Sequence, residues 1–225
     1  MAAGQMYKAS KASDKKKKRV KRSTDTKQNR RIKKLENIVY PSIDWKTKDT
    51  NAYDASIPNT PYQNYPMFAL GKGTADNQRK GDKVSLRHAT LHLSLTRGDT
   101  SNIVRVLVVK TPSSTYAGLS DVLEYHNFSS HSELVFSSPY QITATNNEQT
   151  YQVMYDNVFQ LDGDKSTKAV KIKLKLPKKG VECNFVGDSV VSPNNYNISL
   201  LMISDSTAAP HPKASYAFRC KFIDL

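Results

Sequence analysis

The sequence predicts an all-β domain, a sandwich or barrel of roughly eight short strands, preceded by a basic and disordered N-terminal segment. Three observations predict this arrangement. Apolar and polar residues alternate in several short runs after residue 80, which is the period of β-strands. No long run shows helical periodicity. Positive charge is concentrated before residue 35, in a block with too little apolar surface to offset the entropy of ordering.

The N-terminal segment is a lysine-rich arm. Residues 1–34 contain 14 Lys or Arg against two acidic residues, a net charge of +12 out of +14 for all 225 residues. The remainder of the chain therefore carries a net charge of only +2. Such an arm binds polyanions because the phosphates that it neutralises release condensed counterions. We therefore expect nucleic acid as its partner, in preference to acidic lipid, a protein, or a role in solubility alone.

The arm supplies most of the expected nucleic-acid-binding residues. They are Lys11, Lys15, Lys16, Lys17, Lys18, Arg19, Lys21, Arg22, Lys27, Arg30, Arg31, Lys33 and Lys34. The run 15–22 also matches a nuclear localisation signal, made of Lys15, Lys16, Lys17, Lys18, Arg19, Lys21 and Arg22. Because Tyr7 is the one aromatic residue of the arm, we expect phosphate contacts without sequence preference. The spacing of Ile32, Leu35 and Val39 indicates a short helix when the arm binds, ended by Pro41.

The elements of the domain follow in order. Prolines interrupt residues 41–75, which we expect to be extended and irregular. The apolar residues of 84–95 change parity, which indicates a bulge near Ala89 or two short strands. A helical turn is expected at 119–125. Runs of β-branched residues or alternation predict further strands at 103–110, 151–161 with a break near Asp156, 169–176, 196–204 and 216–222.

The strand at 169–176 shows the clearest alternation. Apolar residues occupy one face, and Lys171, Lys173 and Lys175 occupy the other. These lysines form either the solvated face of an edge strand, where they discourage pairing with other sheets, or an inner surface that faces phosphates. Both interpretations remain open, and the three lysines are retained as candidate nucleic-acid-binding residues.

The sequence predicts no enzyme, no cofactor and no metal site. His88 and His92 share a strand face but lie about 13 Å apart, too far to hold one ion. The segment 162–165 lacks the glutamate of a calcium loop and predicts a hairpin turn. Cys183 and Cys220 are expected as buried core residues in a reducing compartment. Neither a secretory signal nor a membrane-spanning run is present in the sequence, so neither secretion nor a membrane partner is expected.

Several segments resemble one family in the same order. The segment 71–84, with Gly71, Gly73 and the run Asp-Asn-Gln-Arg-Lys-Gly-Asp-Lys-Val, resembles the start of the first strand in capsid proteins of small circular Rep-encoding (CRESS) ssDNA viruses, which are circovirus-like. Coat proteins of satellite necrosis viruses share a similar segment. Residues 105–109 resemble the second strand, and 151–156, 169–176 and 216–222 resemble later strands. The resemblance covers residues 68–225.

This resemblance implies a single eight-stranded antiparallel jelly roll of the viral coat type at residues 41–225, with a mostly disordered basic arm at 1–40. It implies a structural protein that self-assembles as a homo-oligomer, a shell of about 60 copies with the arm inside. The packaged partner would be single-stranded nucleic acid, with circular ssDNA as the first expectation. The expected locations are the virion and, during assembly, the host nucleus, with host nuclear import factors as further partners and a receptor that the sequence does not identify.

Two alternatives remain open. The arm is shorter than circovirus arms and rich in Lys where they are rich in Arg. Lysine lacks the planar fork of Arg, which favours packing of a flexible strand and leaves a satellite coat protein with an ssRNA genome as one alternative. The other alternative is a cellular nucleic-acid-binding β-domain protein with a basic tail.

Overall fold

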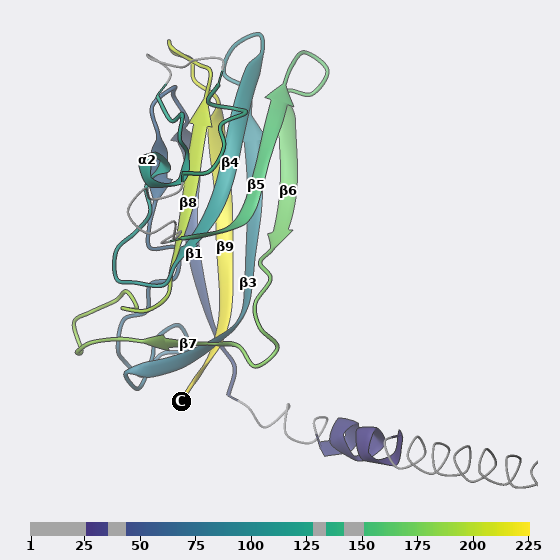
Figure 1. Ribbon diagram of the computed structural model, residues 1–225, viewed down its shortest axis with the longest axis vertical. Coiled ribbons are helices and arrows are strands. Elements are labelled where there is room, and N and C mark those ends of the chain that lie inside the picture. Colours follow the sequence, from purple (N-terminus) through teal and green to yellow (C-terminus); the bar gives the residue numbers. More distant parts are fainter. Residues whose placement is uncertain (1–25, 36–43, 128–133, 142–150) are drawn as a thin grey trace, which may run out of the picture. The chain divides into compact units, whose positions relative to one another are not determined.

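The computed structural model describes residues 26–35, 44–127, 134–141 and 151–225 (Figure 1). The chain divides into two units, Met1–Asp44 and Trp45–Leu225. In the first unit, residues 26–35 form a helix whose side chains are all exposed, in agreement with the spacing of Ile32 and Leu35. This segment is rich in the good helix formers Lys, Arg and Gln, and the mostly disordered arm at 1–40 stays a prediction.

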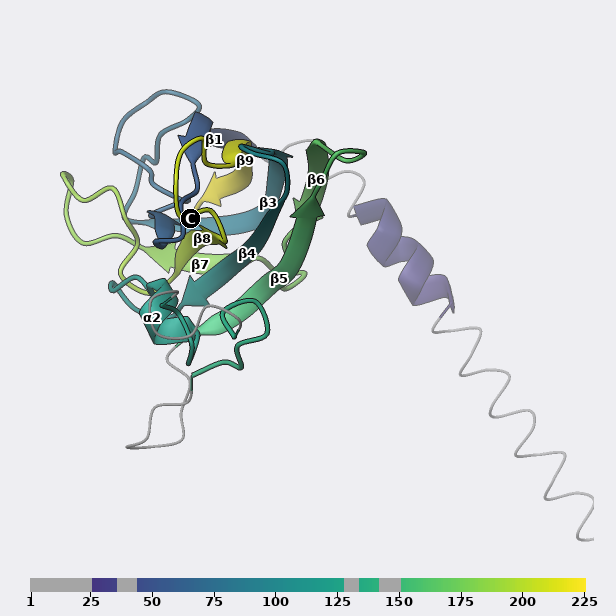
Figure 2. The ribbon, with the colours of Figure 1, turned by 90° about the horizontal axis from the view of Figure 1, so that it is seen from above.

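The second unit is an all-β sandwich of two antiparallel sheets. In one sheet the order is β1 (Lys46–Ser56), β9 (Lys213–Asp224), β3 (Lys83–Thr96) and β6 (Thr167–Lys173), and β7 (Val181–Asn184) pairs with the start of β3. In the other sheet the order is β2 (Tyr62–Asn64), β8 (Asn197–Ser204), β4 (Asn102–Thr111) and β5 (Gln152–Leu161). Figure 2 shows β9 and β3 facing β8 and β4 across the core. A four-residue helix, α2 (Leu119–Val122), lies between β4 and β5 in the chain and confirms the predicted helical turn.

The strand order is that of an eight-stranded jelly roll, which confirms the predicted fold class. Successive strands mostly change sheet, and β1 and β2 at the start of the domain pair with β9 and β8 at its end. The short β7 is an addition to this plan. Because β1 and β2 come first, the segment 71–84 leads into the third strand and residues 105–109 lie in the fourth. Their predicted assignment to the first and second strands is wrong.

β1 and β2 lie in the segment that was expected to be irregular. The sequence of β1, KTKDTNAYDAS, has almost no apolar alternation. It is held instead by backbone pairing with β9 along its whole length, from Lys46 opposite Phe222 to Ser56 opposite Lys213. An edge strand of this kind depends on its partner more than on its own residues, so periodicity does not reveal it.

The irregularities of the strands differ in place from those predicted. β3 is one continuous strand whose bulge lies between Leu86 and His88, close to the predicted position. β5 has no break at Asp156, and its irregularity lies near Met154, where the pairing with β4 shifts. The segment 162–165 forms the predicted turn, with the Lys165 amide donating to the Asp162 carbonyl at 3.1 Å. It connects two different sheets, however, so it does not close a hairpin.

The core between the sheets contains the inward side chains of both. Cys183 and Cys220 are free and buried there, as predicted. A second cluster of buried side chains lies on the outer side of the β2-β8-β4-β5 sheet. Within the described residues, no helix has the length and apolar character needed to cross a membrane.

Candidate nucleic-acid interface

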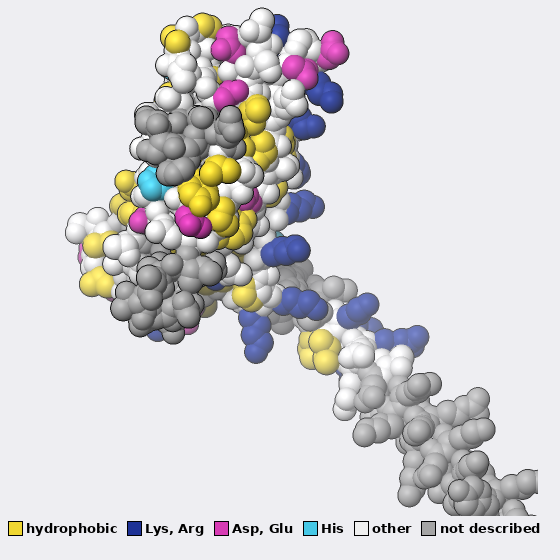
Figure 3. Space-filling model, turned by 45° about the horizontal axis from the view of Figure 1, so that its top comes forward, with side chains coloured by type: hydrophobic (Ala, Val, Ile, Leu, Met, Phe, Trp, Pro, Cys, Tyr) yellow, Lys and Arg dark blue, Asp and Glu magenta, His cyan; other side chains and the backbone are white. Residues whose placement is uncertain are grey.

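One face of the β1-β9-β3-β6 sheet packs on the core, and its other face, named here the cationic face, is polar and exposed. Its residues are Lys213, Ser215, Ala217, Arg219 and Lys221 of β9, His88, Thr90, His92 and Ser94 of β3, Lys171 and Lys173 of β6, and Lys175 just beyond β6. They alternate with buried residues such as Leu91 and Phe218, so the two-residue period places them on the side away from the core. Lys and Arg side chains line the edge of the domain that carries β6 (Figure 3).

The antiparallel register arranges these side chains in rows across the sheet. The rows are Lys171–His92–Ala217, Lys173–Thr90–Arg219 and His88–Lys221. Directly opposed side chains in such rows lie about 5 Å apart at Cβ. Both histidines therefore share one sheet face, as predicted, and each lies beside a lysine. Within the described part of the chain, no three His, Cys, Asp or Glu side chains gather in a metal-binding group.

The β9 side of the cationic face is partly neutralised. Arg219 donates from Nε and Nη2 to the two carboxylate oxygens of Asp49 at 2.8 and 2.6 Å. These hydrogen bonds hold the pKa of Asp49 below its ordinary value. By contrast, the β6 lysines Lys171 and Lys173 form no ion pair with any described residue. The unpaired charge of the face therefore lies at its β6 edge.

The outer side of the other sheet is covered. The described parts of the long connection between β4 and β5, residues 112–127 and 134–141, place α2 and its neighbours over this sheet (Figure 1). The buried residues of this contact are Leu107, Val109, Ala117, Leu119, Val122, Leu123, Val135, Tyr151, Leu201 and Ile203. Only the cationic face is therefore a broad, polar sheet surface available to a ligand within the described residues.

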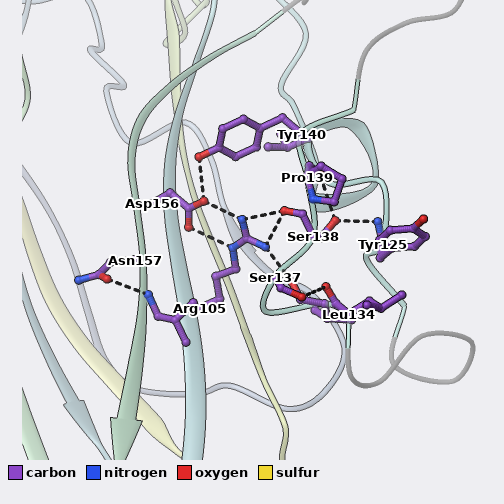
Figure 4. Close-up of polar contacts among 12 residues, drawn as sticks. Arg105, Tyr125, Leu134, Ser137, Ser138, Pro139, Tyr140, Asp156 and Asn157 are labelled. Atoms are coloured by element: carbon purple, nitrogen blue, oxygen red, sulfur yellow. Dashed lines mark hydrogen bonds and ion pairs between the residues drawn. The ribbon is translucent and has the colours of Figure 1, made fainter.

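A buried arginine holds this cover in place (Figure 4). Arg105 of β4 donates from Nε and Nη2 to Asp156 of β5 at 3.0 and 2.7 Å, and from Nη1 to the carbonyls of Val135 and Ser138 at 2.8 and 3.2 Å. Tyr140 donates its hydroxyl to the same carboxylate at 2.8 Å. Burial, and then this hydrogen bond to Asp156, raise the pKa of Tyr140 to about 12. The network is structural, because all its donors are used within the protein.

A second buried arginine, Arg79, holds the segment 71–84 in place. Arg79 is fully buried, with its guanidinium 4.6 Å from the ring centre of Phe185. It donates to Asp82 at 2.9 Å and to the carbonyls of Gly187 and Val190 at 2.7 and 3.1 Å. The Arg-Lys-Gly-Asp run thus joins the loop before β3 to the loop after β7. Its role here is to close the end of the sandwich.

The predicted binding residues fall into three groups. Lys11, Lys15, Lys16, Lys17, Lys18, Arg19, Lys21 and Arg22, which include the predicted nuclear localisation signal, lie outside the described residues, as do Val39 and Pro41. Lys27, Arg30, Arg31, Lys33 and Lys34 are exposed on the helix 26–35. Lys171, Lys173 and Lys175 are exposed on or just after the edge strand β6, so the structure confirms the edge-strand position. Lys175 also lines, with Lys110, a pocket of about 780 Å³ between the edges of the two sheets.

Sequence reasoning missed the contribution of β9 to the cationic face. Arg219 and Lys221 alternate with the buried residues Phe218, Cys220 and Phe222, and this alternation is visible in the sequence. What the sequence does not show is the pairing that places β9 between β1 and β3. Tyr53 of β1 lines the same pocket as Lys171 of β6, and no local pattern in the sequence indicates this.

The fold and this surface define the class of the protein as an all-β jelly roll with one cationic sheet face. No protein-family model matches the chain, and no curated protein matches its sequence. Its structure is similar to structures of turnip yellow mosaic virus, with 12% identity over 80% of this chain and 92% of that one and a TM-score of 0.39. It is also similar to mud crab tombus-like virus, with 9% identity over 79% and 86% of the two chains and a TM-score of 0.41. For Desmodium yellow mottle tymovirus the identity is 11% over 79% and 85%, with a TM-score of 0.37. At such low values no family follows from these likenesses, and the function is inferred below from the residues of the chain itself.

Proposed function

We propose that this chain is the coat protein of a small virus, which assembles into an icosahedral shell and packages single-stranded nucleic acid. Circular ssDNA is the genome that we favour, and a satellite ssRNA genome is the alternative. The observation that carries the proposal is the distribution of cations over a jelly roll. Fourteen basic residues lie in the N-terminal arm and six more on the cationic face, while within the described residues the outer side of the other sheet is closed by its own loops.

The helix of the arm supports a polyanion partner. At 100° per residue, Lys27, Arg30, Arg31 and Lys34 fall on one side of the helix 26–35. Like charges at spacings of three and four residues repel one another and weaken an isolated helix. Phosphates that lie along this side would remove the repulsion, so binding and helix formation stabilise each other. The same logic favours a nucleic acid over an uncharged protein surface.

The charge of the arm sets a scale for the packaged strand. About 60 copies of an arm with a charge of +12 supply on the order of 700 positive charges, enough to neutralise a similar number of phosphates. A longer genome needs additional cations. The lysines of the cationic face are suited to this role if that face is directed toward the genome.

Assembly requires that copies of the domain tolerate contact with one another. Beyond the arm, residues 35–225 carry a net charge of only +2, so repulsion between copies is weak. Several large apolar side chains are exposed on the domain and suit contacts between copies. They are Tyr65, Leu134, Tyr140, Val158, Val186, Val190, Val191 and Leu225.

Assembly of the purified full chain tests the proposal. We expect size-exclusion chromatography and electron microscopy to show particles of megadalton size, with nucleic acid revealed by the ratio of absorbance at 260 and 280 nm. A variant with Lys15, Lys16, Lys17 and Lys18 changed to Gln serves as the charge control and should lose nucleic acid. A monomer under all salt and pH conditions would contradict the proposal and favour a cellular nucleic-acid-binding protein.

The run 15–22 carries the proposal of nuclear import before assembly. The full chain fused to a fluorescent reporter should accumulate in the nucleus of a transfected cell. The matched control changes the basic residues of this run to Gln and leaves the rest of the arm intact. If the two fusions divide equally between nucleus and cytoplasm, the proposal that host nuclear import factors bind this run is wrong.

A further inference from the structure

We propose that Tyr53 forms a base-stacking subsite on the cationic face, where an unpaired nucleobase of a single-stranded nucleic acid lies on the tyrosine ring. The inference rests on the proposed function and adds to it a specific contact to bases. The arm and the lysines contact phosphates and do not distinguish a single strand from any other polyanion. An aromatic platform does, because only an unstacked base can lie on it.

The exposure of Tyr53 is the first observation. Its side chain is 82% exposed, the largest value among the exposed large hydrophobic residues of the described chain. An aromatic side chain of this size normally buries much of its surface, and full exposure leaves apolar area in contact with water. A flat partner that covers the ring would remove this apolar area from water, which favours binding.

A bulge in β1 fixes the position of Tyr53. Ala52 is opposite Tyr216 and Ala55 is opposite Ala214, so two residues of β1, Tyr53 and Asp54, stand opposite one residue of β9. Asp54 has a φ of 50°, in the left-handed region that non-glycine residues seldom adopt. β-bulges bend a strand and redirect a side chain, and they recur beside functional sites.

The bulge is closed by a reciprocal contact with β9. The Asp54 amide donates to the Ser215 hydroxyl at 3.1 Å, and that hydroxyl donates to the Asp54 carboxylate at 3.4 Å. The backbone on either side of Tyr53 is therefore held to the sheet although its ring is free of the core. The tyrosine ring is therefore exposed on a backbone that is already fixed, so no loop has to become ordered when a ligand binds.

A pocket lies beside the ring. It has a volume of about 480 Å³, within the range of small-ligand sites. Its lining includes the small side chains Ser94, Ala169, Ser215 and Ala217, together with Tyr53, Asn51, His92 and Lys171. The small residues leave space over the sheet for a planar group.

The charges around the pocket suit a nucleotide. Lys171 is opposite His92 in the sheet, so an ammonium group and an imidazole lie together on the side of the pocket formed by β3 and β6. A base on Tyr53 can thus have its phosphate near Lys171, and Asn51 offers an amide to the base edge. Because every base has a π-face, the subsite should be tolerant of sequence.

Binding of three polymers by the full chain tests the inference. The polymers are a deoxythymidine oligomer, an abasic oligomer with the same number of phosphates, and a duplex of equal length. We expect Tyr53→Ala to weaken binding of the deoxythymidine oligomer about 5- to 150-fold, which is the usual effect of removing one stacking side chain. Binding of the abasic oligomer and of the duplex should not change. Tyr53→Phe keeps an aromatic ring at this position, so it serves as the matched control and should bind as the unmodified chain does.

A direct contact is tested by photo-crosslinking. An oligomer that carries 5-iododeoxyuridine should crosslink to the peptide that contains Tyr53, with fragment masses that place the adduct on this residue. No loss with Tyr53→Ala, an equal loss for the abasic oligomer, or adducts confined to other residues would overturn the stacking subsite and leave the proposed function intact. Failure of the unmodified chain to bind any of the polymers would instead overturn the proposed function itself.

Discussion

Replacement of Lys171, Lys173 and Lys175 by Gln should reduce the salt dependence of nucleic-acid binding by a countable amount. The three side chains are exposed, and none forms an ion pair within the described residues, so each is available to a phosphate. For a single strand, each phosphate contact contributes about 0.7 to the slope of log K against log salt concentration. Three contacts therefore contribute about 2 to that slope.

This slope can be converted into a change of affinity. Between 50 and 200 mM salt, a slope difference of about 2 changes the ratio of the two affinities by roughly 20-fold. We expect the variant to bind much more weakly than the unmodified chain at low salt, and the difference to shrink as salt rises. The arm contributes its own large slope to both proteins, and this contribution cancels in the comparison.

The assay is fluorescence anisotropy of a labelled single-stranded oligomer, titrated at four or more salt concentrations. A control variant with Lys72, Lys80 and Lys165 changed to Gln has the same net charge, but its substitutions lie in the loop before β3 and in the β5–β6 turn. In this control variant, the slope of log K against log salt concentration should fall by less than half of the fall seen when Lys171, Lys173 and Lys175 are replaced. Equal slopes for the two variants would refute the reasoning, because they would mean that only net charge matters and that the cationic face is no binding surface.

Three further predictions concern the packing of the domain. Arg105→Ala should lower the free energy of unfolding in urea by about 3 kcal/mol, because it leaves the largely buried carboxylate of Asp156 without its cation, and an unchanged midpoint would contradict this. Burial raises the pKa of Cys183 to about 12 and that of Cys220 well above its ordinary value, so at pH 8 Ellman's reagent should label neither thiol in the folded protein and both after unfolding. The pKa of Tyr140 is raised in the fold to about 12, so the stabilisation that comes from its protonated hydroxyl is complete below pH 10 and is lost between pH 10 and 12. Over this interval the Tyr140→Phe variant should lose less stability than the unmodified chain, as measured by unfolding followed by circular dichroism.

The strands that the sequence predicts are those with a strongly apolar side. β4 and β8 are buried along almost their whole length, and β9 alternates without interruption, so period and composition both identify them. β1 has neither feature, and its existence follows only from pairing with β9. A residue pattern reports which side of a strand is buried, and it contains no information on which distant strand supplies the hydrogen bonds.

The candidate interface shows the same division. The lysine stripe of β6 is visible in the sequence because its alternation is local. The cationic face is not, because it joins β6 to β3 and β9 through pairings between distant parts of the chain; His88 and Lys221, for example, are 133 positions apart. The position of Tyr53 depends in addition on the bulge in β1. The residues around Asp54 do not predict that two residues of β1 lie opposite one residue of β9.

Some basic residues of this domain are engaged by carboxylates and others are not, and the difference bears on what binds the domain. Arg79, Arg105 and Arg219 each engage a carboxylate, and the first two are buried and also hold backbone carbonyls. Their planar, multi-donor guanidinium groups suit this structural task. Lys171 and Lys173 form no ion pair with the part of the chain that the structure describes. A net charge of +2 for residues 35–225 therefore understates the charge at the β6 edge, because ion pairs neutralise other basic residues of the domain and leave Lys171 and Lys173 unopposed within the described residues. If the arginines are structural, Arg105→Lys should destabilise the domain although it keeps the charge, while Lys171→Arg should leave both stability and nucleic-acid binding intact. The opposite pattern would mean that the arginines act through charge alone.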